Sequence, residues 1–98
     1  MRKKFIVAVD DPTAAQKKKL SEYFKGKYGW WHWIGGFWMV TDSTGELTAA
    51  MIRDKVGELA PNTRRLVMEI KESGGWAGFG PTTESKNMFK WIRETWSD

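Results

Sequence analysis

The spacing of hydrophobic residues changes several times along the chain, and each spacing predicts one element. Residues 5–9 form a short continuous apolar run, which is typical of a buried strand. Leu20 and Phe24 follow at helical spacing within a polar stretch, so we expect a helix over residues 12–25. Asp11, with proline directly after it, predicts the cap at the start of that helix.

Two aromatic runs separated by Gly35-Gly36 make residues 29–42, GWWHWIGGFWMVTD, a predicted β-hairpin. A two-residue turn of this kind favours positive φ, which glycine accepts. Strict alternation around the turn then places one set of side chains on the first face of the sheet: Trp31, Trp33, Trp38 and Val40. The other face receives the second set: Trp30, His32, Ile34, Phe37, Met39 and Thr41.

The rest of the chain predicts a helix, a strand, a link and a last helix. Thr48 begins the helix and Pro61 ends it, because proline cannot continue the hydrogen-bond ladder. Residues 65–71 alternate as a strand, residues 74–81 form a glycine-rich link, and residues 83–96 carry an apolar stripe at helical spacing.

The element order is therefore β-α-β-β-α-β-α, an α+β arrangement. We expect one ferredoxin-like βαββαβ domain over residues 1–98, with a four-stranded antiparallel sheet and an additional C-terminal helix. Ninety-eight residues suffice for a single core.

Two helices cover only one face of such a sheet, and the hairpin leaves the other face apolar. Three covers are open: the last helix, a second copy of the chain, or single-stranded nucleic acid stacked on the aromatic rings. A symmetric homodimer is the first expectation, because it is the commonest solution for a small domain. The expected interface residues are Trp30, His32, Ile34, Phe37 and Met39.

Composition limits the chemistry. The chain has no cysteine and one histidine, which excludes disulfides and thiol chemistry and leaves too few ligands for a structural zinc site. The longest apolar runs are shorter than the roughly 20 residues that span a bilayer, and the apolar run behind the N-terminal MRKK is too short for a secretory signal. We therefore expect a cytoplasmic protein without a membrane partner.

The net charge is +4 and the basic residues occur in clusters, which suits a polyanion such as DNA or RNA. The candidate phosphate-binding residues are Lys17, Lys18, Lys19, Arg64 and Arg65. A merely solvated surface explains the same charges equally well.

The chain shares four features with a set of small uncharacterised proteins, which it resembles: the strand FWMVTD, the helix TAAMIRDKV, the strand RLVMEIK, and a Trp-Ala-Gly link before a tryptophan-containing final helix. More broadly, the chain resembles the small CRISPR-associated subunit that partners the integrase, and the VapD-type toxins. That resemblance implies a ferredoxin-like homodimer that in some members is a metal-dependent nuclease. It implies that Asp10, at the end of the first strand, is the catalytic residue and the Mg²⁺ ligand.

The leading expectation is thus a small dimeric nucleic-acid-associated protein, with Mg²⁺-dependent nuclease activity left open. The alternative reading of Asp10 is a plain strand-end carboxylate. The alternative function is a non-catalytic adaptor or inhibitor that binds a protein partner through a tryptophan-rich sheet face. The glycine-rich link also leaves open a small-molecule pocket between the sheet and the last helix, although it lacks the spacing of a phosphate-binding loop.

Overall fold

The computed structural model of this protein describes residues 2–71 and 74–96. It is an α+β structure, as the sequence predicts. The elements, in chain order, are β1 (Lys3–Val9), α1 (Ala14–Lys27), β2 (Gly29–Ile34), β3 (Phe37–Asp42), α2 (Ala49–Leu59), β4 (Arg65–Glu69) and the short π-helix η1 (Ile92–Trp96).

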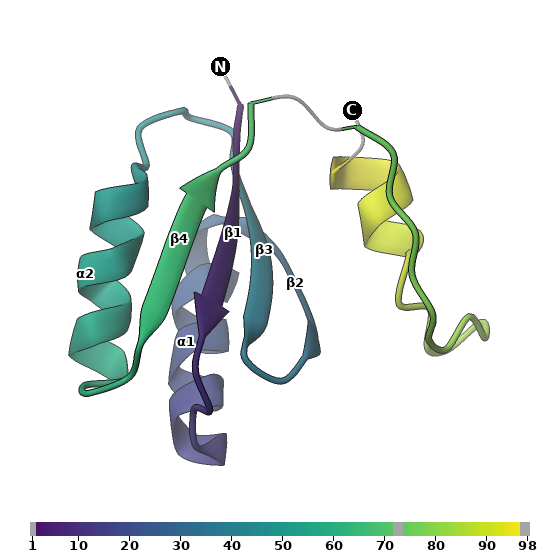
Figure 1. Cartoon of the computed structure of the whole chain (residues 1–98). Coiled ribbons are helices and arrows are strands. Elements are labelled where there is room, and N and C mark those ends of the chain that lie inside the picture. Colours follow the sequence, from purple (N-terminus) through teal and green to yellow (C-terminus); the bar gives the residue numbers. More distant parts are fainter. Residues whose placement is uncertain (1, 72–73, 97–98) are drawn as a thin grey trace.

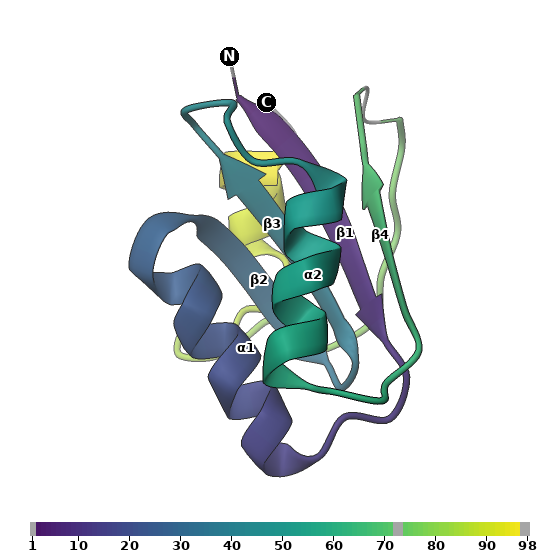
Figure 2. The same cartoon turned by 90° about the vertical axis from the view of Figure 1, so that its left-hand side faces the viewer.

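The four strands form one antiparallel sheet in the order β2-β3-β1-β4. Three layers result: α1 and α2 lie on one face of the sheet, and residues 74–96, here called the C-terminal segment, lie on the other (Figure 1). The two helices cover the sheet side by side (Figure 2). We call the sheet face opposite the helices the second face.

The main core lies between the helices and the first face of the sheet. Alternate residues of β1 point into it, and β3 and both helices supply the rest. All of the following are buried: Phe5, Val7, Val9, Leu20, Phe24, Trp38, Val40, Ile52 and Val56. Burial of each large side chain contributes about 1.5–3 kcal/mol, so this cluster is the principal source of stability.

The start of α1 differs from the prediction by two residues. Thr13, not Asp11, is the N-cap: its hydroxyl accepts a hydrogen bond from Gln16 N–H, and the Gln16 side chain accepts one from Thr13 N–H. Asp11 has φ 48°, in the left-handed region, so the chain is still turning there. The cap predicted for α2 is confirmed, because the Thr48 hydroxyl accepts from Met51 N–H.

The hairpin turn at Gly35-Gly36 is confirmed, but the reason given for its glycines is wrong. Neither residue has a φ in the left-handed region. Instead, the Val9 N–H donates to the Gly36 carbonyl at 2.7 Å, and a Cβ on Gly36 would overlap the Val9 carbonyl oxygen. Glycine is needed at position 36 because the backbone at the end of β1 lies in direct contact with the turn and leaves no room for a Cβ atom.

A β-bulge in β2 changes the faces predicted for the hairpin. Trp31 pairs with Met39 and Ile34 pairs with Phe37, so two residues of β2 oppose one residue of β3 between these pairs. The extra residue reverses the alternation on the N-terminal side of the bulge. Trp31 therefore lies on the second face, while Trp30 packs against the main core; the sequence had predicted the reverse.

The predicted C-terminal helix is largely replaced by a loop. The Thr83 hydroxyl accepts a hydrogen bond from Lys86 N–H, and Thr83 N–H donates to the Lys86 carbonyl. These local bonds close a turn and compete with helix formation. Helical structure begins only at Lys90 and continues as η1. Within the described residues, no helix is long and apolar enough to cross a membrane.

Candidate functional site

The end of β1 brings two of the candidate residues together. Asp10 and Arg64 are 54 positions apart in sequence, yet Asp10 N–H donates to the Arg64 carbonyl at 2.8 Å. The Arg64 guanidinium donates to the same carboxylate oxygen of Asp10 through Nε at 3.0 Å and Nη2 at 2.7 Å. Both side chains are largely exposed, so this pair contributes at most about 1 kcal/mol to stability. Its main effect is to fix the place of Arg64.

The candidate lysines lie on the first turns of α1, at the same end of the molecule. Lys18 and Lys19 are exposed. Lys17 reaches the hairpin turn, since a Cβ on Gly35 would lie 3.7 Å from its ammonium nitrogen. No acidic residue lies in the first turn of α1, so the positive end of the helix dipole adds to these charges. We call this surface the basic end; it consists of Lys17, Lys18, Lys19 and Arg64.

Arg65 has a different environment from Arg64. Its Nη1 donates to the Thr63 carbonyl at 2.9 Å, and its guanidinium lies close to Gly57 of α2. The side chain therefore ties β4 to α2. Asp10, Arg64 and Arg65 nevertheless line one shallow hollow of about 320 Å³.

The donor set at Asp10 does not match a magnesium site within one chain. The described residues contain no group of three or more histidine, aspartate or glutamate side chains that could hold a metal ion. One oxygen of Asp10 already accepts two hydrogen bonds from Arg64. Mg²⁺ is usually held by one or two carboxylates together with several waters, so a site here would require Arg64 to release Asp10.

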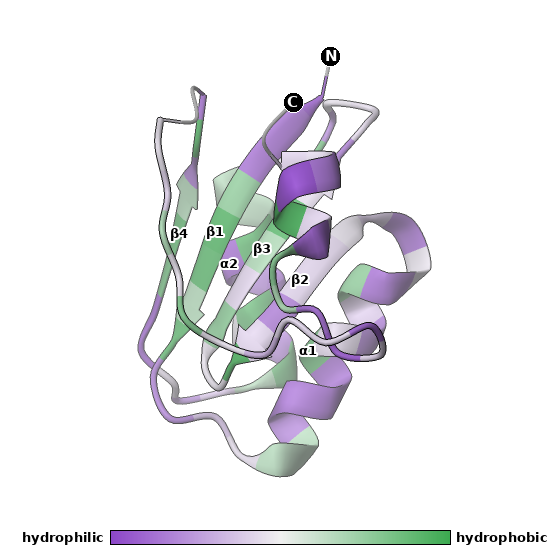
Figure 3. Ribbon diagram, turned by 90° about the vertical axis from the view of Figure 1, so that its right-hand side faces the viewer, coloured by the Kyte–Doolittle hydropathy of each residue, from purple (hydrophilic) through white to green (hydrophobic). Residues whose placement is uncertain are grey.

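The second face carries a continuous apolar surface, which follows from the register of the sheet. Trp31, Met39, Ile6 and Met68 are successive cross-strand partners, and so are Ile34, Phe37, Ala8 and Leu66. The C-terminal segment crosses this face (Figure 3). It buries Trp31 and Met39. At the edges of the covered area, Ile34 of β2 and Leu66 and Met68 of β4 stay 51%, 61% and 48% exposed.

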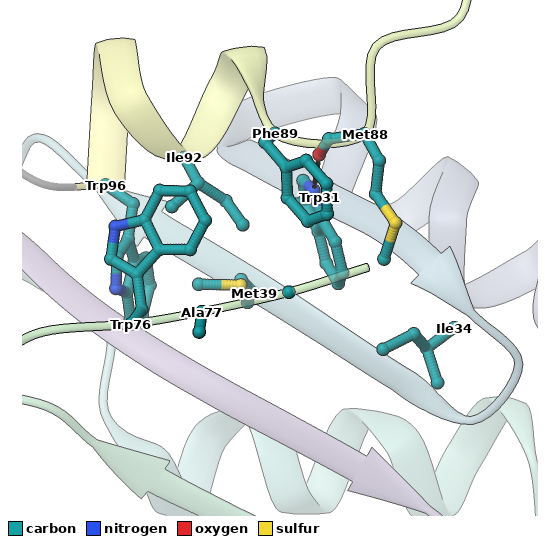
Figure 4. A pocket seen from close by; sticks show the side chains of 10 residues that line it. Trp31, Ile34, Met39, Trp76, Ala77, Met88, Phe89, Ile92 and Trp96 are labelled. Carbon is teal, nitrogen blue, oxygen red and sulfur yellow. Dashed lines mark hydrogen bonds between the residues drawn. The ribbon is translucent and has the colours of Figure 1, made fainter. Parts of the chain in front are cut away.

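Between the sheet and the C-terminal segment lies a cavity of about 190 Å³, here called the aromatic pocket (Figure 4). Its walls include Trp31 and Met39 from the sheet, and Trp76, Phe89 and Trp96 from the C-terminal segment. Trp76 and Phe89 lie with ring centroids 5.7 Å apart. None of the described side chains that line the pocket is charged.

One buried hydrogen bond fastens the C-terminal segment to the sheet. Trp31 Nε1–H donates to the Met88 carbonyl at 2.6 Å. At the other end of the second face, Lys4 is buried with its ammonium group 5.6 Å from the centre of a Trp96 ring. The cover of the second face is thus specific, with aromatic rings placed by a hydrogen bond and a cation–π contact.

The predicted interface residues divide between the two faces. Ile34, Phe37 and Met39 lie on the second face, as expected. Trp30 belongs to the helix side, and His32 stacks on Trp38 with ring centroids 4.1 Å apart. The bulge explains both differences.

His32 also has a structural partner at the hairpin turn. Its Nε2 lies 2.9 Å from the Gly35 carbonyl oxygen, so this nitrogen carries the proton and donates. The ring is held between Trp38 and the turn, where it closes the hairpin.

Sequence reasoning missed the buried carboxylate of Asp42. Its two oxygens accept hydrogen bonds from Thr44 N–H and hydroxyl at 3.0 and 2.8 Å and from Leu47 N–H at 2.8 Å. Burial alone would raise the pKa of Asp42, but these hydrogen bonds lower it below its ordinary value. The signal in the sequence is Asp-Ser-Thr-Gly after a strand, which is typical of an aspartate-stabilised turn.

The aromatic pocket was foreseen only in outline. The link at residues 74–81 and the last segment were expected to border a pocket, but the individual wall residues depend on the bulge and on the loop that replaces the helix. Comparison of the chain with protein-family models, curated proteins and solved structures found no match.

Proposed function

We propose that this protein binds the phosphate backbone of DNA or RNA through the basic end, without catalysing a reaction within a single chain. The observation that carries the proposal is the convergence of Lys17, Lys18 and Lys19 from α1 with Arg64, the residue directly before β4. These residues come from distant parts of the sequence, yet all lie at the end of the sheet where β1 stops.

The charge environment supports phosphate binding. The chain carries a net charge of +4, and the positive end of α1 adds a partial charge next to the three lysines. Asp10 holds Arg64 in place and leaves the other guanidinium nitrogen for a phosphate oxygen. Such contacts position a nucleic acid and do not read its sequence.

We assign the domain to the ferredoxin-like class and expect it to act as a homodimer. The element order β1-α1-β2-β3-α2-β4 and the sheet order β2-β3-β1-β4 support the class. The apolar side chains left open on the second face support the homodimer. A Mg²⁺ site stays a prediction of the resemblance alone; it needs Arg64 to leave Asp10 and a second carboxylate from another copy.

The test is a fluorescence-anisotropy titration of labelled single- and double-stranded DNA and RNA at several salt concentrations. Each phosphate contact on duplex DNA contributes about 0.9 to the slope of log affinity against log salt. We expect Lys18→Gln/Lys19→Gln to lower that slope by about 2 and to weaken binding to all sequences alike. Glutamine retains helix propensity, so α1 stays folded.

The matched control is Lys25→Gln/Lys27→Gln. These two lysines are exposed at the other end of the same helix, and the variant loses the same charge. The proposal requires a clear difference between the two double variants. Equal slopes would show that only net charge matters, and absence of binding by the wild type at low salt would reject nucleic-acid binding altogether.

Nuclease activity is read in the same experiment by adding Mg²⁺ and analysing the products on a gel. Intact nucleic acid supports the non-catalytic proposal. Cleavage that Asp10→Asn abolishes would replace it with the metal-dependent mechanism.

A second candidate, an adaptor or inhibitor that binds a protein partner, has one observation in its favour. Ile34, Leu66 and Met68 are large hydrophobic side chains that stay about half exposed on the second face. The chain's own C-terminal segment covers Trp31 and Met39, so such a partner would use the uncovered part. Binding of this kind would respond little to salt, which separates it from the first candidate.

A further inference from the structure

Phe79 is fully exposed, which is uncommon for phenylalanine. Its two neighbours, Gly78 and Gly80, pack closely against Phe89 and Met88, farther along the same C-terminal segment. A Cβ on Gly78 would lie 2.5 Å from the Phe89 ring, and a Cβ on Gly80 would overlap the Met88 sulfur. Because both flanking residues are packed inward, the Phe79 side chain stands out from the surface.

The aromatic pocket begins one residue away, since Gly78 and Ala77 form part of its wall. The described residues of its lining present mainly apolar surface, and none of them is charged. An apolar cavity of about 150 Å³ stays dry and binds benzene. A volume of about 190 Å³ therefore has room for one phenyl ring.

We propose that two copies of this chain associate by exchanging Phe79, so that the phenyl ring of each copy fills the aromatic pocket of the other. A two-fold contact requires that the same surface supply both the inserted group and its receptor. Phe79 and the pocket meet this requirement because they are adjacent on one face. Each pocket is incomplete until the other copy supplies its ring.

The surrounding surface is suited to such a contact. Ile34 and Trp76 border the pocket and are 51% and 43% exposed. Leu66 and Met68 extend the apolar surface along β4. All four would form the rim around the exchanged rings.

The accessible area of the chain is also compatible with a second copy on this face. A folded monomer of 11.3 kDa is expected to expose about 5,700 Å². This chain exposes 6422 Å², which is about 700 Å² more than that expectation. A stable interface of standard size buries about 800 Å² on each partner, so the excess is of the size that one interface removes.

This inference rests on the homodimer proposed above and is independent of nucleic-acid binding. The experiment is sedimentation velocity of the full chain over a range of protein concentrations. The variant is Phe79→Ser. The matched control is Met51→Ser, which removes a half-exposed hydrophobic side chain from α2, on the opposite side of the sheet.

We expect the wild type and Met51→Ser to be dimeric, and the dissociation constant of Phe79→Ser to rise by roughly 100-fold or more, because each dimer loses two buried rings. Circular dichroism should be unchanged, since Phe79 is fully exposed within its own chain. A dimer that Phe79→Ser leaves intact would overturn the exchange and preserve the homodimer. A monomeric wild type at all concentrations would overturn both.

A cysteine pair tests the destination of the ring, because the natural chain has no cysteine. The single variants Phe79→Cys and Ile34→Cys are mixed and oxidised, and a disulfide between the two different chains is expected. If Phe79→Ser is monomeric but this mixed disulfide does not form, the aromatic pocket is not the receptor. A monomeric wild type whose tryptophan fluorescence changes with added toluene would instead define a small-molecule site and overturn the proposal.

Discussion

Asp42 is the last residue of β3 and supports the loop that follows. Among the described residues in and next to loops, we expect its replacement to destabilise the fold more than the loss of any other charged side chain. The Asp42 residue is 2% exposed and closes the connection between β3 and α2. It accepts hydrogen bonds from Thr44 and from Leu47, and Leu47 is itself 1% exposed. The two acceptor oxygens serve different partners, so no single uncharged side chain of the same shape satisfies both.

The magnitude follows from what each partner can do after the change. The Leu47 N–H is buried, so losing its charged acceptor costs about 1.5–3 kcal/mol. Thr44 is exposed and can bond to water, so its two lost bonds cost together about 0.5–1 kcal/mol. We expect Asp42→Ala to lower the free energy of unfolding by about 3 kcal/mol, and the melting temperature by about 12–24 °C. Asp42→Asn should cost about 2 kcal/mol, because its amide nitrogen must face one of the two donors.

The pH dependence has a definite sign. The pKa of Asp42 is lowered in the folded state, so its contribution is complete above the unfolded value of about 3.9 and is lost as the pH falls through the folded pKa. Urea denaturation at neutral pH should therefore separate the wild type from Asp42→Asn. At a pH well below the pKa of Asp42 in the folded state, the difference in unfolding free energy between the wild type and Asp42→Asn should shrink towards zero.

Asp54→Asn is the matched control, because it removes one carboxylate whose side chain is 71% exposed and paired only with exposed Arg53. Its effect should stay within about 0.5 kcal/mol. Equal destabilisation by Asp42→Asn and Asp54→Asn would show that the buried hydrogen bonds of Asp42 do not stabilise the fold. A difference between Asp42→Asn and the wild type that persists unchanged at low pH would refute the pH argument.

Two further predictions concern backbone approach and the cover of the second face. Gly36→Ala should destabilise the protein by about 1–3 kcal/mol, because the new methyl group overlaps the Val9 carbonyl oxygen, whereas Gly26→Ala on exposed α1 should stabilise it by about 0.5–1 kcal/mol. Thermal unfolding of the two variants checks both signs, and a Gly36→Ala variant as stable as the wild type would contradict the steric explanation. Trp31→Phe should cost about 1–3 kcal/mol and increase hydrogen exchange in the C-terminal segment, because the Met88 carbonyl loses its buried donor. Exchange that increases equally in α2 would show general destabilisation instead.

Local features of the sequence predicted most of the elements. Thr48 and Pro61 mark the limits of α2 because a cap and a helix breaker act within one turn. Gly35-Gly36 marks the hairpin turn. The exact cap of α1 was missed because Asp11 and Thr13 both suit the position, and the left-handed φ of Asp11 depends on how the chain leaves β1.

The candidate site was harder to predict from the sequence than the helices and strands. The basic residues could be named from the sequence, but nothing local indicates that Arg64 meets Asp10 while Arg65 packs towards α2. Adjacent residues in extended backbone point in opposite directions. The partner of Arg64 is Asp10, 54 positions away, and the Arg65 side chain lies close to Gly57 of α2.

The order of the elements and the presence of two apolar sheet faces follow from the amino-acid sequence alone, because periodicity and capping depend on neighbouring residues. Which tryptophan lies on which face depends on the folded sheet. One extra residue in β2 exchanges Trp30 and Trp31, and period-two alternation carries no warning of a bulge. The folded contacts also determine that a loop and a short helix, held by the Trp31–Met88 hydrogen bond, cover part of the second face and leave Phe79 exposed. These outcomes depend on contacts between distant segments, whose energies appear only when the chain has folded.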